Sequence, residues 1–294
     1  MKVLNFGSLN VDYVYQVDHI LLPGETIAAS SRTIFAGGKG LNQSIALAKA
    51  GAPVFHAGLV GDDGDILLEE LSANRVDTRF VERKSGPGGH TVIQVDKDGQ
   101  NSILLFGGTN RCITQEFADR VLAAFCEGDW LVLQNEINEL AYIMQKAHGR
   151  GMKIALNPSP FDSNLDSCDL SLVNLFMINE IEGGQITGEK DPEKILERMK
   201  QLYGGAQVLL TLGGDGSLFR DGESVYRQPV FKVRAVDTTA AGDTFTGYFL
   251  TGLLEGKGPE EALRTAAKAA AIAVTRPGAA GSIPCRDEVA RWQG

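Results

Sequence analysis

The sequence predicts a doubly wound, three-layer α/β fold with a mostly parallel central sheet and a small, separate β-sheet. Short, uniformly apolar runs alternate with helix-like stretches through most of the chain, which is typical of parallel strands buried between two layers of helices. Four other segments alternate apolar and polar residues, as strands with one exposed face do. The chain has 294 residues, 43% of them hydrophobic and 22% charged, which fits a single domain over residues 1–294 with a small appendage.

The apolar runs predict the strands of the central sheet. The first is residues 3–6, which end at Gly7. Each of the others is short and bounded by turn residues or charges, as buried parallel strands are. They cover residues 54–57, 130–133, 153–156, 172–178 and 208–212.

Helices are predicted between these strands. Gly51 ends the first of them, and Pro259 begins the last, with Glu260 and Glu261 in the first turn, where acidic side chains stabilise a helix. The predicted helices cover residues 41–50, 64–74, 114–126, 138–148, 191–203, 242–255 and 259–275, and one further helix opens at Asn179.

The small sheet is predicted from the segments with alternating polarity. They lie at about residues 11–18, 26–35, 90–96 and 101–106, and residues 98–100 join the last two as a hairpin. Pro23, Gly24 and Glu25 separate the first two of these segments. A two-faced sheet in an acidic protein covers a partner subunit or a ligand site.

The charge balance excludes several classes of partner. Lys and Arg number 28 and Asp and Glu 37, so the formal net charge is −9. An acidic chain without a basic stripe binds nucleic acid and anionic membranes poorly. The longest stretch without charged residues, 201–214, is too short to cross a bilayer. The four cysteines lie far apart and no signal-peptide pattern precedes Asp12, so we expect reduced thiols and a cytoplasmic protein.

Residues 235–247 (AVDTTAAGDTFTG) place small residues immediately before a predicted helix. Such a turn points several unpaired N–H groups toward one spot, and the helix dipole adds partial positive charge. This is how an acidic protein can hold a polyphosphate. Asp243 lies at the same helix start, where a carboxylate can take the proton of a hydroxyl group that attacks phosphate. The alternative is that Asp243 only caps the helix.

Residues 36–43 (AGGKGLNQ) form a second glycine-rich segment. It is neither a Walker A loop nor a GxGxxG fingerprint, which argues against a nicotinamide dehydrogenase. Its backbone amides, with Lys39 and Asn42, are suited to a ligand rich in hydroxyl groups. An ordinary turn before the helix at 41–50 is the alternative.

Three further motifs follow predicted strands. Asn10 and Asp12 pair an amide with a carboxylate, which suits sugar hydroxyls but also a turn. Asn179 and Glu182 share one helix face, either as oxygen ligands near a metal ion or as a capping box. Residues 211–216 are rich enough in glycine for a flat ring to lie against the backbone, and a hairpin turn is the alternative.

The order of these motifs is more specific than any one of them. GSLNVD, GGKGLNQ, LNPSP, INEIE, TLGGDGS and DTTAAGDTFTG follow one another between residues 3 and 290. In this the chain resembles the phosphofructokinase-B (ribokinase-like) family of carbohydrate kinases, and among its members those that act on ribose. The resemblance implies a phosphotransferase with an alcohol acceptor that uses ATP, Mg²⁺ and an activating K⁺. Another pentose, deoxyribose, a hexose or a nucleoside stays open as the acceptor, and a non-catalytic sugar-binding regulator is a further alternative.

The resemblance also implies a role for individual residues. Asp243 would be the base that deprotonates the 5-hydroxyl group of D-ribose, giving ribose 5-phosphate. The amides of Ala240, Ala241, Gly242 and Asp243 would form the anion hole for the γ-phosphoryl group. The sugar would be held by Asn10, Asp12, Gly38, Lys39, Gly40, Asn42, Glu136 and Asp243. The nucleotide and Mg²⁺ would be held near Asn179, Glu182, Thr211, Gly213, Gly214, Asp215, Gly216 and Gly242.

A potassium site and a lid complete what the resemblance implies. The positions that match the family's K⁺ site are Asp237, Thr239, Ala273, Arg276, Gly278 and Ser282. Pro277 is a departure from the family pattern that makes the cation geometry less certain. The small sheet would be a lid that closes over the sugar and excludes water. Because lids of this family pair between two subunits, a homodimer is expected.

Overall fold

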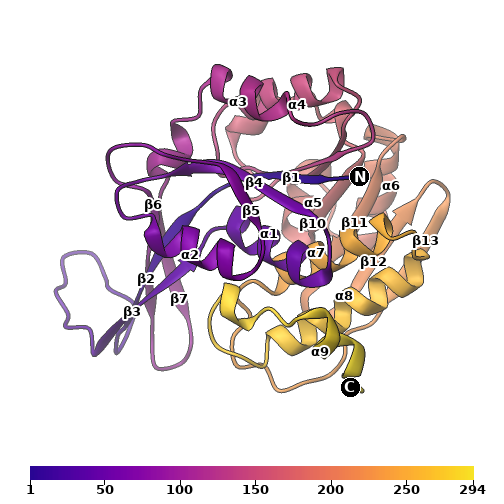
Figure 1. Ribbon diagram of the computed structural model, residues 1–294. Helices are drawn as coiled ribbons and strands as arrows, with labels where there is room; N and C mark the ends of the chain where they lie inside the picture. Colours follow the sequence, from indigo (N-terminus) through magenta and orange to yellow (C-terminus); the bar gives the residue numbers. More distant parts are fainter.

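The computed structural model describes residues 1–294, in which nine strands form a central sheet and four others a small sheet beside it (Figure 1). The central strands are β1 (Val3–Phe6), β4 (Val54–Val60), β5 (Asp77–Arg83), β8 (Trp130–Gln134), β9 (Lys153–Asn157), β10 (Leu175–Asn179), β11 (Gln207–Thr211), β12 (Ser217–Asp221) and β13 (Ser224–Gln228). Their order is β13-β12-β11-β10-β9-β8-β1-β4-β5. The last two strands of the sequence pair antiparallel at one edge, and the others are parallel.

Strand β1 lies where the winding of the sheet changes direction. Val3 is opposite Val54 of β4 on one side and Trp130 of β8 on the other. In open α/β sheets, the crevice at such a point, beyond the carboxyl ends of the strands, is where ligands bind. All four residues of β1 are buried, as the apolar run predicted. The doubly wound α/β fold is therefore confirmed.

Helices cover both faces of the central sheet and divide the interior into two hydrophobic cores. The helices are α1 (Lys39–Ala50), α2 (Asp65–Ala73), α3 (Gln115–Leu122), α4 (Leu140–Gly149), α5 (Glu180–Thr187), α6 (Pro192–Leu202), α7 (Ala241–Leu254), α8 (Pro259–Ala273) and α9 (Arg286–Arg291). Val3 belongs to the core under α1, α2, α7 and α8, and Leu4 to the core under α3, α4 and α6. None of the helices is both long and apolar enough to span a membrane.

Some elements differ from the prediction. The run at 172–178 becomes a strand only from Leu175, because residues 170–172 form a 3₁₀ turn. Strand β5 and the β12–β13 hairpin were not predicted. Strand β5 (DTRFVER) lies at the sheet edge and carries charges on both faces, so it lacks the apolar run of a buried strand. Helix α9 is too short to show a period.

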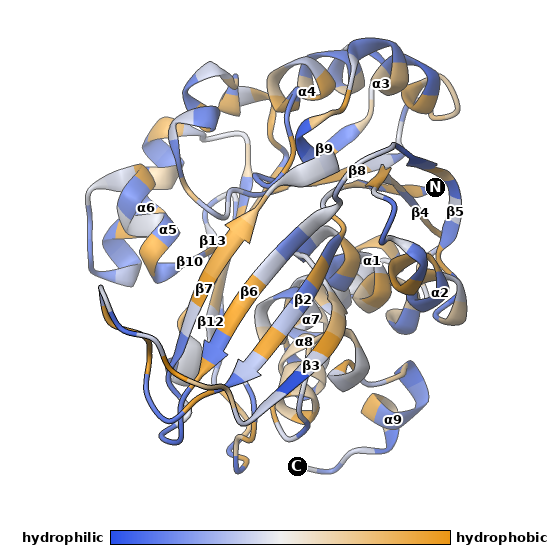
Figure 2. Ribbon diagram, turned by 90° about the vertical axis from the view of Figure 1, so that its left-hand side faces the viewer, coloured by the Kyte–Doolittle hydropathy of each residue, from blue (hydrophilic) through white to orange (hydrophobic).

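The small sheet has the order β3-β2-β6-β7 and stands away from the central sheet. Its strands are β2 (Asn10–Gln16), β3 (Ser31–Gly37), β6 (Gly89–Val95) and β7 (Asn101–Phe106). Apolar residues cluster along β6 and β7 (Figure 2). The strand expected at 26–35 begins only at Ser31, since the residues before it leave the sheet as a loop and have no partner strand.

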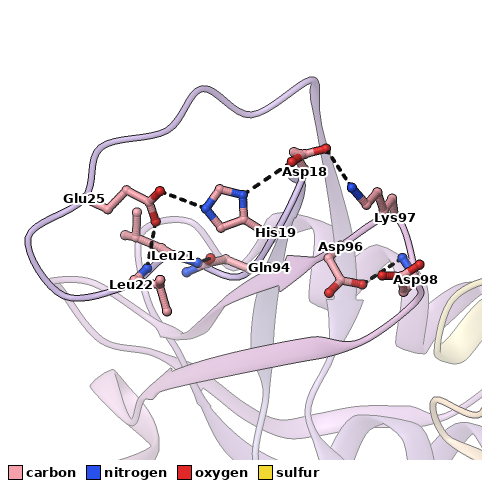
Figure 3. Close-up of polar contacts among 9 residues, drawn as sticks. All are labelled: Asp18, His19, Leu21, Leu22, Glu25, Gln94, Asp96, Lys97 and Asp98. Atoms are coloured by element: carbon pink, nitrogen blue, oxygen red, sulfur yellow. Dashed lines mark hydrogen bonds and ion pairs between the residues drawn. The ribbon is translucent and has the colours of Figure 1, made fainter.

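That loop, which follows β2, is held by side chains. His19 lies between Asp18 and Glu25, with its Nε2 atom 2.8 Å from Glu25 Oε1 (Figure 3). The hydrogen bonds with Glu25 and Asp18 raise the pKa of His19 above its ordinary value. The backbone N–H of Leu21 donates to Gln94 Oε1 of β6 at 2.9 Å. The loop is therefore attached to the small sheet, and protonation of His19 strengthens its internal ion pairs.

Candidate active site

The turn before α7 adopts the conformation that a cluster of free amides needs. Ala240 has a left-handed backbone (φ 58°) and precedes the first residue of the helix. The N–H groups of Ala240, Gly242 and Asp243 have no acceptor within the protein, whereas the N–H of Ala241 donates to the Thr238 carbonyl at 3.2 Å. Three of the four predicted amides are therefore available to an anion at this helix start.

A cavity of about 220 Å³ opens in front of these amides. The side chain of Asp243 faces it, and so does Lys39 from the start of α1. The other predicted site residues that line it are Asn179, Glu182, Thr211, Ala240 and Gly242. The ends of β10 and β11 and the starts of α1 and α7 thus meet at this cavity, whereas the other predicted sugar residues, Asn10, Asp12, Gly38, Gly40, Asn42 and Glu136, do not line it.

Two amide side chains from α1 hold the carboxylate of Asp243. Asn42 Nδ2 donates to Oδ2 at 3.2 Å, and Gln43 Nε2 donates to Oδ1 at 3.0 Å. The two helices can come this close because Gly247 of α7 has no side chain: a Cβ atom there would lie 2.5 Å from the Cβ of Ala46. The carboxylate is therefore fixed by donors on both oxygens, with the cavity on its open side.

Lys39 supplies the positive charge of the site. Burial disfavours its ammonium group, but the nearby carboxylates of Asp243, Glu136 and Glu182 outweigh that effect and raise the pKa of Lys39. The side chain therefore stays charged at neutral pH. One cation among three carboxylates is a local device for binding phosphate in an acidic protein.

Glu136 follows β8 and lies at the same end of the sheet. Its Oε2 accepts a hydrogen bond from the Ser8 hydroxyl group and another from the Lys39 backbone N–H, at 3.2 Å. Burial raises the pKa of Glu136, and the positive charge of Lys39 opposes that rise. Glu136 thereby connects the end of β1 to the glycine-rich turn.

Asp12 and Asn10 lie on β2, next to that turn. Burial raises the pKa of Asp12 to about 6, while a 2.6 Å hydrogen bond from Thr91 works against the rise. Asn10 Oδ1 accepts from Asn110 Nδ2 at 2.7 Å. A Cβ atom at residue 37 would lie 1.9 Å from Asp12 Oδ2, so a side chain there would displace the Asp12 carboxyl group.

An unpaired atom indicates where a ligand binds. Asn42 Oδ1 is buried and has no hydrogen-bond partner, although Asn42 Nδ2 is paired with Asp243. A buried acceptor without a donor is costly, and a ligand hydroxyl group would satisfy it. This atom and the polar atoms of Asn10 and Asp12 fit a ligand with several hydroxyl groups.

A second cavity, of about 740 Å³, lies on the other side of Gly242. Thr211, Gly213, Gly214 and Gly216, which were expected beside the nucleotide, line it, but Asp215 is exposed and lines neither cavity. The other walls of this larger cavity are the segment 228–235 and the apolar side of α8, for which the sequence predicted no role. A large, half-apolar cleft joined to a small polar one fits a nucleotide whose phosphates reach the helix start.

Asn179 and Glu182 form a capping box at the start of α5. The N–H of Glu182 donates to Asn179 Oδ1 at 2.9 Å, and the N–H of Asn179 donates to Glu182 Oε2 at 3.0 Å. The capping box that was the alternative to a role near a metal ion is thus present, and both residues also line the smaller cavity. Glu182 Oε1 keeps free lone pairs. No group of three His, Cys, Asp or Glu residues could hold a metal ion.

The residues of the expected potassium site lie on two adjoining loops. Asp237 accepts hydrogen bonds from the Thr239 N–H and hydroxyl groups, and from the Gly278 N–H at 2.9 Å. The Ala273 carbonyl accepts from the Arg276 N–H at 3.0 Å, and the Arg276 side chain pairs with Glu288. Asp237 therefore ties the 276–282 loop to the turn before α7 despite Pro277.

Sequence reasoning missed several residues that support the site. Gln43 and Ser8 are part of the quoted motifs but had no assigned role, although each bonds a carboxylate of the site. Thr91 and the segment 228–235 carry no motif, and only the tertiary structure brings them to the site.

A three-layer α/β fold with a carboxylate at an amide-lined helix start, between a polar cleft and a larger one, defines a phosphotransferase that acts on a hydroxyl group. The model of the pfkB family of carbohydrate kinases matches residues 1–286, and the chain belongs to this family. A ribokinase of Haemophilus influenzae is 36% identical, with 96% of this chain and 95% of that protein aligned. A deoxyribokinase of Salmonella typhi is 31% identical, covering 97% and 96%.

One of the similar solved structures contains both a sugar and a nucleotide. The structure of Arabidopsis thaliana ribokinase complexed with ribose and ATP matches with a TM-score of 0.85 at 30% identity, covering 99% of this chain and 97% of that one. These comparisons establish the fold and the reaction class, a phosphotransfer to a sugar hydroxyl group.

Proposed function

We propose that the protein transfers the γ-phosphoryl group of ATP to the primary 5-hydroxyl group of D-ribose, giving ribose 5-phosphate. The observation that carries the proposal is Asp243, whose carboxylate faces the smaller cavity beside three free amides. The matching relatives named ribokinase support ribose as the acceptor.

Asp243 would act as the base. Asn42 and Gln43 hold both of its oxygens, so its position is set before substrate arrives. As the sugar oxygen attacks phosphorus, the carboxylate takes the hydroxyl proton. The amides of Ala240, Gly242 and Asp243 would meet the charge on the phosphoryl oxygens, as donors fixed in place do in other phosphotransferases.

The two substrates would bind at different places, since the larger cavity is lined by the predicted nucleotide residues whereas Asn10, Asp12 and Asn42 line neither cavity. The sugar would bind Asn10, Asp12 and Asn42 next to Asp243, where Asn42 Oδ1 lacks a donor. The base of ATP would bind in the larger cleft beside Gly213 and Gly214, with the phosphates directed to Gly242. Lys39 would offset the charge where the two meet.

Two cations belong to the proposal. Mg²⁺ would lie near Glu182 and Asn179 and would neutralise charge on the phosphate oxygens. K⁺ would lie between the loop of Asp237 and Thr239 and the loop of Gly278, with carbonyl groups of Ala273, Arg276 and Ser282. The hydrogen bond from Gly278 to Asp237, which already joins these loops, supports this position.

The first test is an ADP-release assay on a panel of ribose, deoxyribose, other pentoses, hexoses and nucleosides, with and without K⁺. We expect ADP release to depend on sugar, with ribose giving the highest kcat/KM and K⁺ raising the rate. Equal release without any sugar would contradict the base-and-lid arrangement. A preference for deoxyribose would favour the second candidate, which the deoxyribokinase relative supports.

The second test replaces Asp243→Asn. The amide cannot take the hydroxyl proton, so kcat should fall by about 10²–10⁴-fold, while nucleotide binding persists. Thr251→Val is the matched control, because Thr251 is buried on the same helix and its hydroxyl group bonds only the Gly247 carbonyl. Turnover of Asp243→Asn at the rate of the unaltered protein would refute the role of the base.

A further inference from the structure

A network of buried polar side chains runs from Asp243 into the core beneath the site. Gln43 Nε2 donates to Asp243 Oδ1, and Gln134 Nε2 donates to Gln43 Oε1 at 2.6 Å and to Asn5 Oδ1 at 3.0 Å. Asn5, Gln43 and Gln134 have no solvent exposure at all. Fully buried amides are retained in a core only where their hydrogen bonds are made, so this network has a defined geometry.

The network continues to a histidine. Asn5 Nδ2 donates to the Ser44 hydroxyl oxygen at 2.9 Å, which lies 2.7 Å from His56 Nδ1. His56 Nε2 lies 3.3 Å from the Gly7 carbonyl oxygen. Burial lowers the pKa of His56 to about 4, so the ring is neutral at neutral pH.

The charge of Asp243 sets the direction of the hydrogen bonds at one end of this network. At the other end the direction is set by two backbone carbonyls, that of Gly40, which accepts from Asn5 Nδ2 at 2.8 Å, and that of Gly7. A carboxylate only accepts, so Gln43 must present its NH₂ group, and its oxygen must then accept from Gln134. The two amide hydrogens of Gln134 are donated to Gln43 and to Asn5. Asn5 in turn donates to Ser44, whose proton goes to His56 Nδ1, and His56 Nε2–H donates to the Gly7 carbonyl.

One unpaired atom shows that this direction is favoured over local satisfaction. Gln134 Oε1 is buried without any donor. Turning the Gln134 amide over would not help, because its oxygen would then face the oxygens of Asn5 and Gln43. The structure therefore tolerates an unsatisfied acceptor, which is costly in a core, and keeps the donors of Gln134 and Gln43 on the side of Asp243 in place.

Gln43 and Asn42 hold the carboxylate from different sides. Asn42 has a buried Oδ1 atom without a partner, which a ligand hydroxyl group would satisfy, so its bond to Asp243 can change when substrate binds. Gln43 faces the core, where Gln134 fixes the far side of its amide. The Gln43 bond is therefore the constant one.

We propose that Gln43 is a positioning residue for Asp243, and that Gln134 and Asn5 act through it by fixing the orientation of its amide. The proposal rests on the proposed role of Asp243 as the base. The network would stabilise the ionised carboxylate and hold it toward the sugar hydroxyl group, because charge-assisted hydrogen bonds are stronger than neutral ones and polarise one another.

The test compares Gln43→Met and Gln43→Glu with the unaltered protein. Methionine keeps the length of the side chain but removes the donor. The acid limb of the kcat profile, measured at saturating sugar so that protonation of Asp12 in the free protein does not set it, should move up by about one pH unit. The plateau of kcat should fall about tenfold or more, with KM for ATP within about twofold. Glutamate keeps an acceptor for Gln134 but places a second carboxyl group against Asp243, so the limb should move further up.

A double-mutant cycle with Gln134→Met tests whether the core residues act through Gln43. Gln134→Met alone should shift the acid limb in the same direction by a smaller amount. In the Gln43→Met background the same change should have no further effect on the limb, because the residue that it supports is gone. Additive shifts in the double variant would overturn this part of the proposal.

Thr251→Val is the control for a purely structural effect, since it removes a buried hydrogen bond on α7 far from the carboxylate. It should lower the melting temperature without moving the acid limb. If folded Gln43→Met and Gln43→Glu both keep the unaltered limb and kcat, the positioning role is wrong. If Asp243→Asn is fully active, the proposed function itself fails. The two failures are therefore distinguishable.

Discussion

At the scale of single residues, the site contains a carboxyl group that titrates near neutral pH. Burial holds the pKa of Asp12 at about 6, although Thr91 donates a hydrogen bond to it. The folded protein thus keeps a proton on Asp12 that an unfolded chain has already lost. This contribution of Asp12 to the free energy of unfolding falls as the pH rises from about 4 to about 6.

Sugar binding is expected to release a proton near pH 6. Hydroxyl groups that donate to Asp12 favour the carboxylate, so affinity for the sugar should fall as the pH drops below about 6. Calorimetric titration with ribose in two buffers of different ionisation enthalpy measures this release directly.

Thr91→Val tests whether Asp12 is the source of that proton. Removing the Thr91 hydrogen bond should raise the pKa of Asp12 and move the release to higher pH. Heats at pH 6 that do not depend on the buffer would contradict the prediction. A release that Thr91→Val leaves unchanged would assign the proton to another group, such as Glu136.

At the scale of elements, Gly242 at the start of α7 lies at the proposed site but makes no packing contact that requires a glycine. A Cβ atom on Gly242 would meet no protein atom within 4 Å, and Gly242 lines both cavities. The glycine is therefore not required by packing. The missing side chain instead leaves space in front of the helix start, where the proposed phosphoryl group would bind.

Gly242→Ala should therefore fold well and work poorly. Alanine in a helix is favoured over glycine by up to about 1 kcal/mol, so the melting temperature should stay or rise, whereas the methyl group would obstruct the phosphoryl group and lower kcat by about 10²-fold. Gly258→Ala, which also meets no protein atom and lies outside the cavities, is the control and should keep full kcat. Unchanged kcat in Gly242→Ala would show that the phosphoryl group binds elsewhere.

Local sequence predicted the elements that carry their own signal. The buried strands have apolar runs, and the start of α7 has a run of small residues before Asp243, so both were found where the structure has them. Strand β5 and the segment 228–235 lack such signals, because edge position and long-range packing decide their structure. The Gln43–Asp243 contact spans 200 positions, and no local pattern reports it.

At the scale of the whole molecule, the small sheet leaves apolar side chains uncovered. Leu104 is 71% exposed and Ile103 56% exposed, on opposite faces of the edge strand β7. Contiguous exposed apolar residues on a sheet mark an interaction surface. This supports the proposed homodimer through the small sheet, which would also complete a lid over the sugar.

The dimer prediction is tested by charge on this surface. Leu104→Lys or Ile103→Lys, whichever faces the second subunit, should convert the dimer to a monomer in sedimentation equilibrium, because a buried unpaired lysine is unfavourable. Val225→Lys is the control, since Val225 is also half exposed and on an edge strand, β13, but belongs to the central sheet. A monomeric unaltered protein would rule the dimer out.

Most of the groups proposed to bind the acceptor lie far in the sequence from the amides proposed to bind the phosphoryl group. Asn10, Asp12 and Asn42 belong to the first 50 residues, whereas the free amides and Asp243 begin at residue 240, and α1 and α7 bring them together. Under the proposed function, substitutions in the first 50 residues would change which alcohol is accepted and leave the amides at the start of α7 unaltered. Relatives named for ribose and for deoxyribose, at 36% and 31% identity, are the outcome that such a division of labour allows.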